Sequence, residues 1–142
     1  MTTTSEFFTQ NFKADEWTGT GLELMQYLQE QCAERGFDLP SVSAAVDKIK
    51  EEAIEIAAAA TDLQGDEQSM GKLLDELGDM FFTLINVCRL LQVSQEEIIL
   101  NNAQKFFVRI QMIEQALAKN NLQWKDVSYE EIVQLWQLHK DE

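Results

Sequence analysis

Apolar residues recur every three or four positions along most of the chain, which is the spacing of one face of an α-helix. No segment shows the strict alternation of apolar and polar residues that indicates a half-buried strand. Breaks rich in glycine and polar residues separate the periodic segments. The only proline, Pro40, lies in the break RGFDLPS, which follows the first periodic segment. The pattern predicts an all-α helical bundle of about five helices. The expected helices run from about Leu22 to Glu34, from an N-cap at Ser41 or Ser43 to the break TDLQGDEQS, from about Gln68 to Leu91, from Ser94 to about Lys119, and from Ser128 onward.

The apolar stripes of the second and third helices predict which of their residues are buried. On the third helix, about 100° of rotation per residue places a polar stripe beside the apolar face, so that two acids border the expected core. The stripe consists of Lys72, Glu76, Asp79, Thr83 and Asn86. The expected buried residues are Val46, Ile49, Ala53, Ile56, Ala60 and Leu63 on the second helix, and Leu73, Leu77, Met80, Leu84, Val87 and Leu91 on the third.

The second helix carries a matching set of acids in KIKEEAIEI, where Glu52 and Glu55 are three residues apart. Such side chains share one face of a helix. If the two helices pack antiparallel, Glu52 and Glu55 face Glu76 and Asp79, which makes a pocket of four carboxylates. Mutual repulsion then requires either protonation or bound cations. Oxygen ligands without histidine or cysteine favour Mg²⁺, with Mn²⁺ as a substitute.

The overall charge excludes several classes of partner. The chain carries 25 acidic and 11 basic residues, a formal net charge of −14. Such a surface repels nucleic acid and anionic membranes. Because the first residues lack a basic flank and a long apolar centre, and no apolar stretch approaches the ~20 residues of a membrane span, a cytoplasmic protein is expected. The single histidine excludes a ferritin-like di-iron site, which needs two Glu-x-x-His pairs.

Several segments resemble the all-α nucleoside triphosphate pyrophosphohydrolases, the superfamily that contains MazG. The sequence EEAIE, followed after 20 residues by ELGD, is similar to the EExxE and ExxD signature of that superfamily. The resemblance extends from about Leu22 to Lys140, and it implies a MazG-like domain over residues 21–142 with residues 1–20 as a loose N-terminal arm. Further similar segments are LMQYLQEQCAERGFDLPSVSAAVDKIKEE, DELGDMFFTLINVCRLL, NNAQKFFVRIQMIE and LQWKDVSYEEIVQLWQLHK.

The resemblance implies hydrolysis of a nucleoside triphosphate to the monophosphate and pyrophosphate, with magnesium held by Glu52, Glu55, Glu76 and Asp79. The implied catalytic residues are Glu52, as a metal ligand, and Glu51, which would orient or deprotonate the attacking water; Asp75 is the alternative base. The residues implied to bind substrate are Lys72, Asp75, Asn86, Asn102, Lys105, Arg109, Trp136 and Lys140.

Each of these assignments has a structural alternative. The cations Lys72, Lys105 and Arg109 could contact phosphate or form surface salt bridges. Trp136 could stack on the base of the nucleotide or be a core residue. Asn86 could bond to sugar or phosphate, or be a satisfied buried amide.

The sequence leaves two classes of function open. The favoured one is a pyrophosphohydrolase that removes non-standard or surplus nucleotides, whose rivals in the superfamily are dimeric dUTPases and phosphoribosyl-ATP pyrophosphohydrolases. The other is a non-catalytic helical interaction protein. Because one five-helix domain buries only part of its apolar surface and the family is oligomeric, a homodimer or homotetramer is expected, with Phe81, Phe82, Ile85 and Cys88 as contact candidates.

Overall fold

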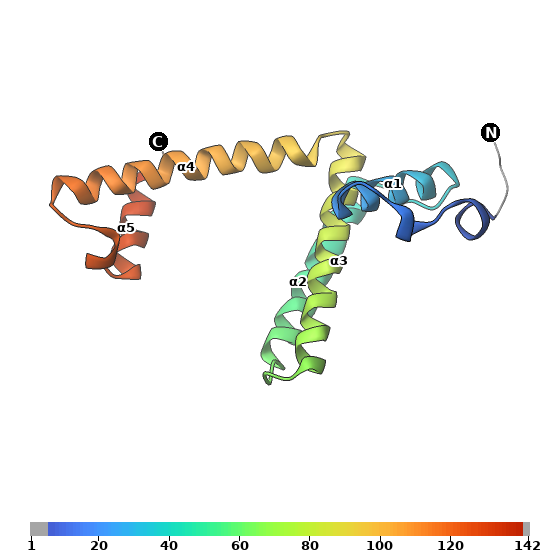
Figure 1. The fold of residues 1–142 in the computed structure, drawn as a ribbon, viewed down its shortest axis with the longest axis horizontal. Coiled ribbons are helices and arrows are strands. Elements are labelled where there is room, and N and C mark those ends of the chain that lie inside the picture. The colour runs from blue at the N-terminus through green and yellow to red at the C-terminus, as the bar shows by residue number, and fades with distance from the viewer. Residues whose placement is uncertain (1–5, 141–142) are drawn as a thin grey trace. The chain divides into compact units, whose positions relative to one another are not determined.

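The structure, a computed structural model, describes residues 6–140, and all regular structure in that range is helical (Figure 1). The all-α fold is thus confirmed, and the helices begin within a residue or so of their expected positions. Residues 1–5, which belong to the expected N-terminal arm, and residues 141–142 lie outside the described range. The α-helices are α1 (Gly21–Glu34), α2 (Val42–Thr61), α3 (Glu67–Leu91), α4 (Gln95–Lys119) and α5 (Tyr129–His139); short helical turns occupy Phe7–Asn11, Ala14–Glu16 and Trp124–Asp126.

Local capping explains where the helices begin. Each N-cap side chain accepts a hydrogen bond from the backbone N–H three residues later, which satisfies one of the unpaired donors of the first turn. Ser128 and Glu131 form the expected reciprocal capping box, whereas at Ser94 only the bond from the Glu97 N–H is present. The N-caps are Thr20, Ser41, Asp66, Ser94 and Ser128.

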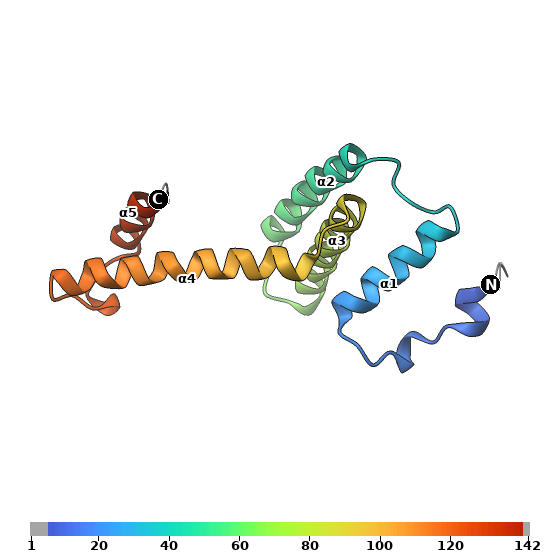
Figure 2. The same ribbon diagram turned by 90° about the horizontal axis from the view of Figure 1, so that it is seen from above.

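The chain divides into two compact units, which meet in sequence at Val93 and Ser94. In the first unit, α2 and α3 lie side by side as a helical hairpin (Figures 1 and 2). Their connection turns at Gly65, whose φ of +81° lies in the left-handed region that glycine adopts without strain. Helix α1 packs against α3, where the side-chain amide of Gln29 donates to the carbonyl oxygen of Phe82.

The row of residues along which α2 and α3 pack together, the packed line, differs from the apolar stripe that the sequence predicts. The expected residues Val46 and Leu63 are more than one third exposed, whereas Ala45 and Ala59 are almost completely buried. The periodicity of α2 is compatible with both lines, and contact with α3 selects the one that passes through Glu52. Positions 45, 49, 52, 56 and 59 of α2 are all buried or half-buried and follow this line, with alternating steps of three and four as in coiled coils. Positions 69, 73, 76, 80, 83, 87 and 90 of α3 show the same spacing, and Ile85 and Asn86 of α3 are buried as well.

The segment before α1 is held by aromatic contacts. The rings of Phe12 and Trp17 lie 5.6 and 5.4 Å from that of Tyr27 on α1, measured between centroids. The guanidinium of Arg35 lies 4.4 Å from the ring centre of Phe7, within cation–π distance. These contacts attach residues 7–17 to α1.

The second unit is a hairpin of α4 and α5 (Figure 1). Ile113 and Leu117 of α4 are buried, and the indole N–H of Trp124 donates to Glu114 over 3.1 Å. Among residues 6–140, no helix combines the length and apolar content needed to cross a membrane.

Candidate metal centre and adjoining cavity

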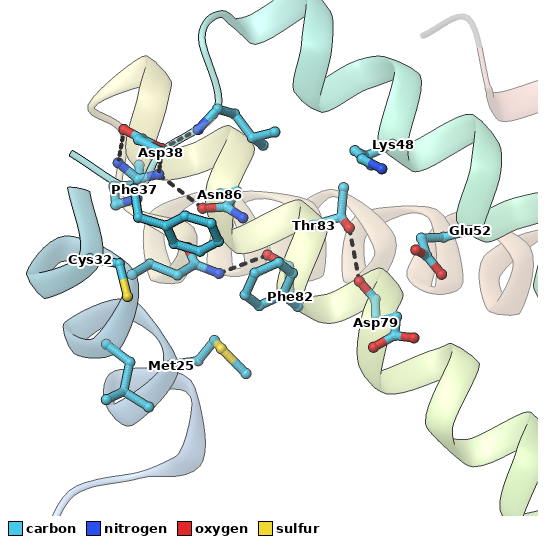
Figure 3. Close-up of a pocket in the computed structure, with 14 residues that line it drawn as sticks. Met25, Cys32, Phe37, Asp38, Lys48, Glu52, Asp79, Phe82, Thr83 and Asn86 are labelled. Carbon is cyan, nitrogen blue, oxygen red and sulfur yellow. Dashed lines mark hydrogen bonds and ion pairs between the residues drawn. The ribbon is translucent and has the colours of Figure 1, made fainter. Parts of the chain in front are cut away.

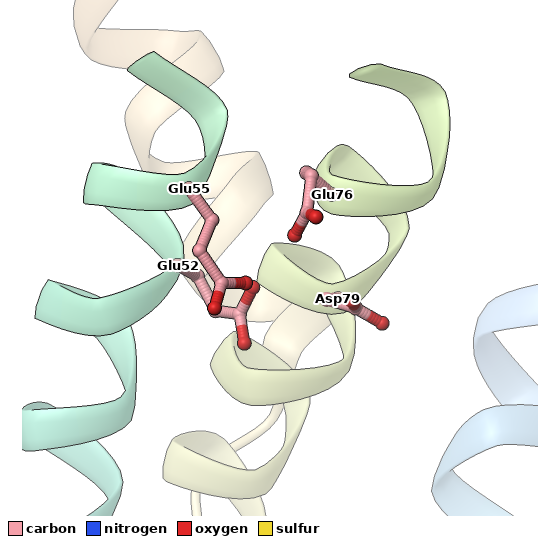
Figure 4. Close-up of side chains that lie close together, drawn as sticks. All are labelled: Glu52, Glu55, Glu76 and Asp79. Carbon is pink, nitrogen blue, oxygen red and sulfur yellow. The ribbon is translucent and has the colours of Figure 1, made fainter. Parts of the chain in front are cut away.

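Four carboxylates converge on one side of the α2–α3 hairpin (Figure 4). Glu52 and Glu55 come from α2, and Glu76 and Asp79 come from α3. One oxygen atom of each residue lies within 4.8 Å of those of the other three. Glu52 and Glu76 occupy packed positions of the helix pair and are half-buried, whereas Glu55 and Asp79 are exposed. The structure therefore brings together the four acids that the spacing singled out.

Burial and repulsion make this cluster unfavourable in its fully ionised form. Removal from water, followed by the charge of Glu55, raises the pKa of Glu52 above its ordinary value. A hydrogen bond with the carboxyl group of Glu55, followed by burial, raises the pKa of Glu76. One oxygen, Oε2, of each of Glu52 and Glu76 is buried without a hydrogen-bond partner in the described part of the chain. Native proteins seldom leave such atoms unpaired unless a water or an ion completes them.

These residues fit a hard divalent cation. The donor set consists of carboxylate oxygens alone, which suits Mg²⁺ or Mn²⁺ better than zinc. A cation among them would satisfy the two buried oxygens and cancel the repulsion that raises the pKa values. The chemistry of the donors and the unpaired oxygens thus point in the same direction.

Lys48 lies beside this cluster and was not among the site residues predicted from the sequence. Its ammonium group forms an ion pair with Glu51 over 3.0 Å, which, as the main cause, raises the pKa of Lys48. Glu51, expected to act on the attacking water, is therefore paired with a lysine on the same exposed face. Because Lys48 precedes Glu51 by three and Glu52 by four residues, helical spacing alone was sufficient to indicate this contact.

A cavity of about 610 Å³ adjoins the carboxylates within the first unit (Figure 3). One end contains Lys48, Glu52 and Asp79, and the rest is bounded mainly by apolar side chains from α1, α3 and the loop before α2. Pockets of this size and character commonly accept small molecules. The lining residues are Met25, Leu28, Gln29, Cys32, Phe37, Asp38, Leu39, Lys48, Glu52, Asp79, Phe82, Thr83, Asn86 and Arg89.

A charged network lines one side of the cavity, and no local sequence pattern indicates it. Both terminal nitrogens of Arg89 donate to the carboxylate of Asp38, with Nη1 at 3.0 Å from Oδ2. Nη2 also donates to Oδ1 of Asn86 over 2.9 Å. The hydrogen bond from Arg89 holds the pKa of Asp38 below its ordinary value. Bidentate pairing of this kind gives a fixed geometry as well as attraction.

The other expected site residues of α3 lie at different depths. Asn86 and Thr83 are buried, and the Thr83 hydroxyl donates to the backbone carbonyl of Asp79 over 2.9 Å. Lys72 and Asp75 are exposed. Ile85, expected to contact a partner subunit, is only 5% exposed, so that expectation is wrong, because the residue is buried within the chain itself.

Three of the expected substrate contacts come together in the second unit. The guanidinium of Arg109 lies 5.0 Å from the ring centre of Trp136, and its Nη2 donates to the backbone carbonyl of Lys140 over 3.3 Å. The ring of Phe106 lies 5.6 Å from that of Trp136. Lys105 and Asn102 are exposed on α4. Arg109 and Trp136 therefore belong to one local cluster.

A helical hairpin with an all-carboxylate cluster and an adjoining cavity defines a class of proteins suited to metal-assisted chemistry. Comparison with known families makes this more specific. The family model described as phosphoribosyl-ATP pyrophosphohydrolase matches residues 22–105, more than half of the chain, and includes all four carboxylates. The chain belongs to this family.

Curated relatives agree with the resemblance to MazG. The chain is 31% identical over 112 residues to a nucleoside triphosphate pyrophosphohydrolase of Escherichia coli (strain K12), covering 79% of this chain and 41% of the relative. It is 26% identical over 119 residues to the nucleoside triphosphate pyrophosphohydrolase/pyrophosphatase MazG of Thermotoga maritima, covering 84% and 44% respectively. The chain thus spans less than half the length of these relatives.

Proposed function

We propose that this chain hydrolyses a nucleoside triphosphate to the nucleoside monophosphate and pyrophosphate, with magnesium held by Glu52, Glu55, Glu76 and Asp79. The observation that carries the proposal is the cluster itself, in which two carboxylate oxygens at the packed line between two helices are buried and find no partner among residues 6–140. A purely structural helix pair gains nothing from acids at such positions, because burial and like charges both oppose ionisation. The names of the relatives support the choice of reaction.

The residues around the cluster have distinct roles in this proposal. Bound magnesium would supply charge neutralisation of the phosphates and lower the pKa of a coordinated water. The carboxylate of Glu51 accepts the proton of the attacking water, and the ammonium of Lys48 orients that carboxylate from 3.0 Å. Asp75, exposed on α3, is the alternative base.

The cations and the indole of the second unit are proposed to bind the substrate. Arg109 and Lys105 contact phosphate, for which a guanidinium has the appropriate fork of donors. Trp136 stacks on one face of that guanidinium, and the carbonyl of Lys140 holds one of its nitrogens, so the arginine is already oriented before substrate arrives. Lys72 and Asn102 complete the set of phosphate contacts.

A homo-oligomer is part of the proposal. In the described part of the chain, only Ala45, Ala59, Ile85, Ile113 and Leu117 are buried among the apolar residues. Phe81 and Phe107 are 60% and 59% exposed. Apolar surface of this extent marks association in a soluble protein. Light scattering after size-exclusion chromatography is expected to give a dimer or tetramer; a monomer at micromolar concentration would contradict this part of the proposal.

Release of pyrophosphate from a panel of standard and modified nucleoside triphosphates tests the reaction. A higher kcat/KM for triphosphates with modified bases would favour a role in removing non-standard nucleotides from the pool. Reaction in ¹⁸O-labelled water identifies the bond that breaks. We expect monophosphate and pyrophosphate as the first products, since the relatives are named for that cleavage. Orthophosphate and diphosphate as first products would overturn the proposal.

Phosphoribosyl-ATP is the second candidate substrate, because the matching family model carries that description. Phosphoribosyl-ATP belongs in the same panel. If its kcat/KM is at least tenfold above that of every nucleoside triphosphate, phosphoribosyl-ATP is the substrate. If neither substrate is hydrolysed in the presence of magnesium or manganese, the non-catalytic alternative is correct.

A further inference from the structure

Two side-chain amides are buried in the cavity beyond the carboxylates. Gln29 of α1 and Asn86 of α3 both line it, and each is only 6% exposed. Neither is needed to hold metal or phosphate in the proposed function. Buried amides normally have their hydrogen-bonding capacity satisfied. Their unused atoms therefore identify what the cavity is able to bind.

The chemistry of its partner fixes the orientation of Gln29. Its Nε2 donates to the backbone carbonyl oxygen of Phe82 over 2.9 Å. A carbonyl only accepts, so the nitrogen of the amide must face Phe82 and the oxygen must face away from it. That oxygen, Oε1, is buried and has no hydrogen-bond partner among residues 6–140. Gln29 thus offers the cavity an acceptor.

The orientation of Asn86 is fixed by a partner that only donates hydrogen bonds, whereas the partner of Gln29 only accepts them. Its Oδ1 accepts a hydrogen bond from Nη2 of Arg89 over 2.9 Å. A guanidinium only donates, so the nitrogen of Asn86 must point elsewhere. Arg89 is itself held by both carboxylate oxygens of Asp38. Asn86 thus offers a donor, and Asp38 and Arg89 act as positioning residues.

The surroundings of the two amides select the kind of ligand. Met25, Leu28, Phe37 and Phe82 line the same cavity, whose other end contains the carboxylates of Glu52 and Asp79 (Figure 3). A nucleotide has the corresponding division between a charged phosphate chain and a flat base with apolar faces and a polar edge. Every nucleobase carries a donor next to an acceptor on that edge. A sugar offers hydroxyl groups instead, without extended apolar faces for these walls.

We propose that Gln29 and Asn86 bind the polar edge of the substrate's nucleobase and determine base preference. Oε1 of Gln29 accepts a hydrogen bond from a ring N–H or exocyclic amino group, and Nδ2 of Asn86 donates to a neighbouring ring nitrogen or carbonyl oxygen. The inference rests on the proposed function in taking a nucleotide as the ligand. Its location of the base is independent of which phosphate bond is cleaved.

Two substitutions test the amides separately. Asn86→Asp retains an oxygen for Arg89 but replaces the donor to the base by an acceptor. Gln29→Met preserves the length of the side chain but removes the acceptor. Each should lower kcat/KM for the preferred triphosphate ten- to a hundredfold, and Asn86→Asp should also change the ranking of the four bases. Matched controls are Asn101→Asp on α4 and Gln26→Met on α1, which lie outside the cavity lining and should change kcat/KM less than twofold.

An analogue that needs no variant provides the decisive comparison. Methylation of the ring nitrogen at the base edge should reduce kcat/KM at least tenfold with the wild-type protein, while removal of the sugar 2′-hydroxyl should change it much less. Equal hydrolysis of methylated and unmethylated substrates would overturn the inference. So would equal losses with all bases in Asn86→Asp, or dependence on the sugar alone.

A binding measurement distinguishes failure of this inference from failure of the proposed function. Free nucleosides, added without metal, should shift the side-chain amide NMR signals of Gln29 and Asn86 but not that of Gln26. If these shifts occur while no triphosphate is hydrolysed, the proposed reaction is wrong and the base site stands. If triphosphates are hydrolysed but the signals do not move at saturating nucleoside, the base site is wrong.

Discussion

Magnesium should stabilise this protein through the four carboxylates, and Glu52→Gln should remove most of that stabilisation. Glu52 is the informative position because its Oε2 is buried with no partner in the part of the chain that the structure describes, and because its pKa is raised mainly by removal from water. Glutamine keeps the shape of the side chain but removes its charge. The metal-free variant should therefore melt at or above the temperature of the metal-free wild type, whereas most changes at a packed position are destabilising.

The size of the effect follows from linkage between binding and folding. A ligand at a hundred times its Kd, bound only by the folded state, stabilises that state by about 2.7 kcal/mol. For a chain of 142 residues, an unfolding entropy of about 2.1 cal/mol/K per residue converts this to a rise of about 9 °C in Tm. If Glu52→Gln weakens magnesium binding a hundredfold, the same concentration should raise Tm by only about 1 °C.

Differential scanning calorimetry at one protein concentration, with and without magnesium, measures both values. Glu34→Gln, an exposed acid at the end of α1, is the matched control and should retain the full shift. A full magnesium shift in Glu52→Gln would refute the assignment of this residue as a ligand. A metal-free variant that melts well below the wild type would refute the claim that its charge is unfavourable in the fold.

Three further predictions concern pH, phosphate binding and capping. Because the pKa values of Glu52 and Glu76 are raised in the folded protein, the folded state binds more protons than the unfolded state at pH values above the ordinary pKa of 4.5. Urea melts of the metal-free protein should therefore show a free energy of unfolding that increases as the pH falls from neutral toward 4.5. A flat profile, or a decrease over that range, would contradict the two shifts. Arg109→Ala should lower kcat/KM ten- to a hundredfold for every triphosphate, as loss of a charged hydrogen bond to phosphate implies, while Lys125→Ala should have almost no effect; a loss confined to one base would show that Arg109 contacts the nucleoside. Ser128→Ala removes half of a capping box and should lower the free energy of unfolding by about 1 kcal/mol without changing kcat, as measured by denaturant titration.

The sequence by itself determined the local features of this protein. The helices begin at side chains that cap the backbone three residues later, as at Ser41 and Ser128, and such contacts depend only on nearby residues. The spacing of Glu52 from Glu55, and of Glu76 from Asp79, likewise put each pair on one helical face before any packing was known. The prediction that the two pairs meet followed because a short break allows the two helices to pack as a hairpin.

Only the tertiary structure decided which faces meet. The hydrophobic residues of α2 allow a packed line through Val46 and Leu63, but contact with α3 selects the line through Ala45, Glu52 and Ala59. Periodicity describes a helix in isolation, and the choice between two apolar lines depends on the surface opposite.

The same reason explains why the cavity could not be read from the sequence. Gln29 bonds to a residue 53 positions away and Arg89 to Asp38 at a separation of 51, and no local pattern relates positions so distant. Gln29 and Asn86 present a defined acceptor and donor only because the carbonyl of Phe82 and the guanidinium of Arg89 occupy their other atoms. A side chain's type is a property of the sequence, whereas the atom that it leaves unpaired depends on which groups folding places beside it.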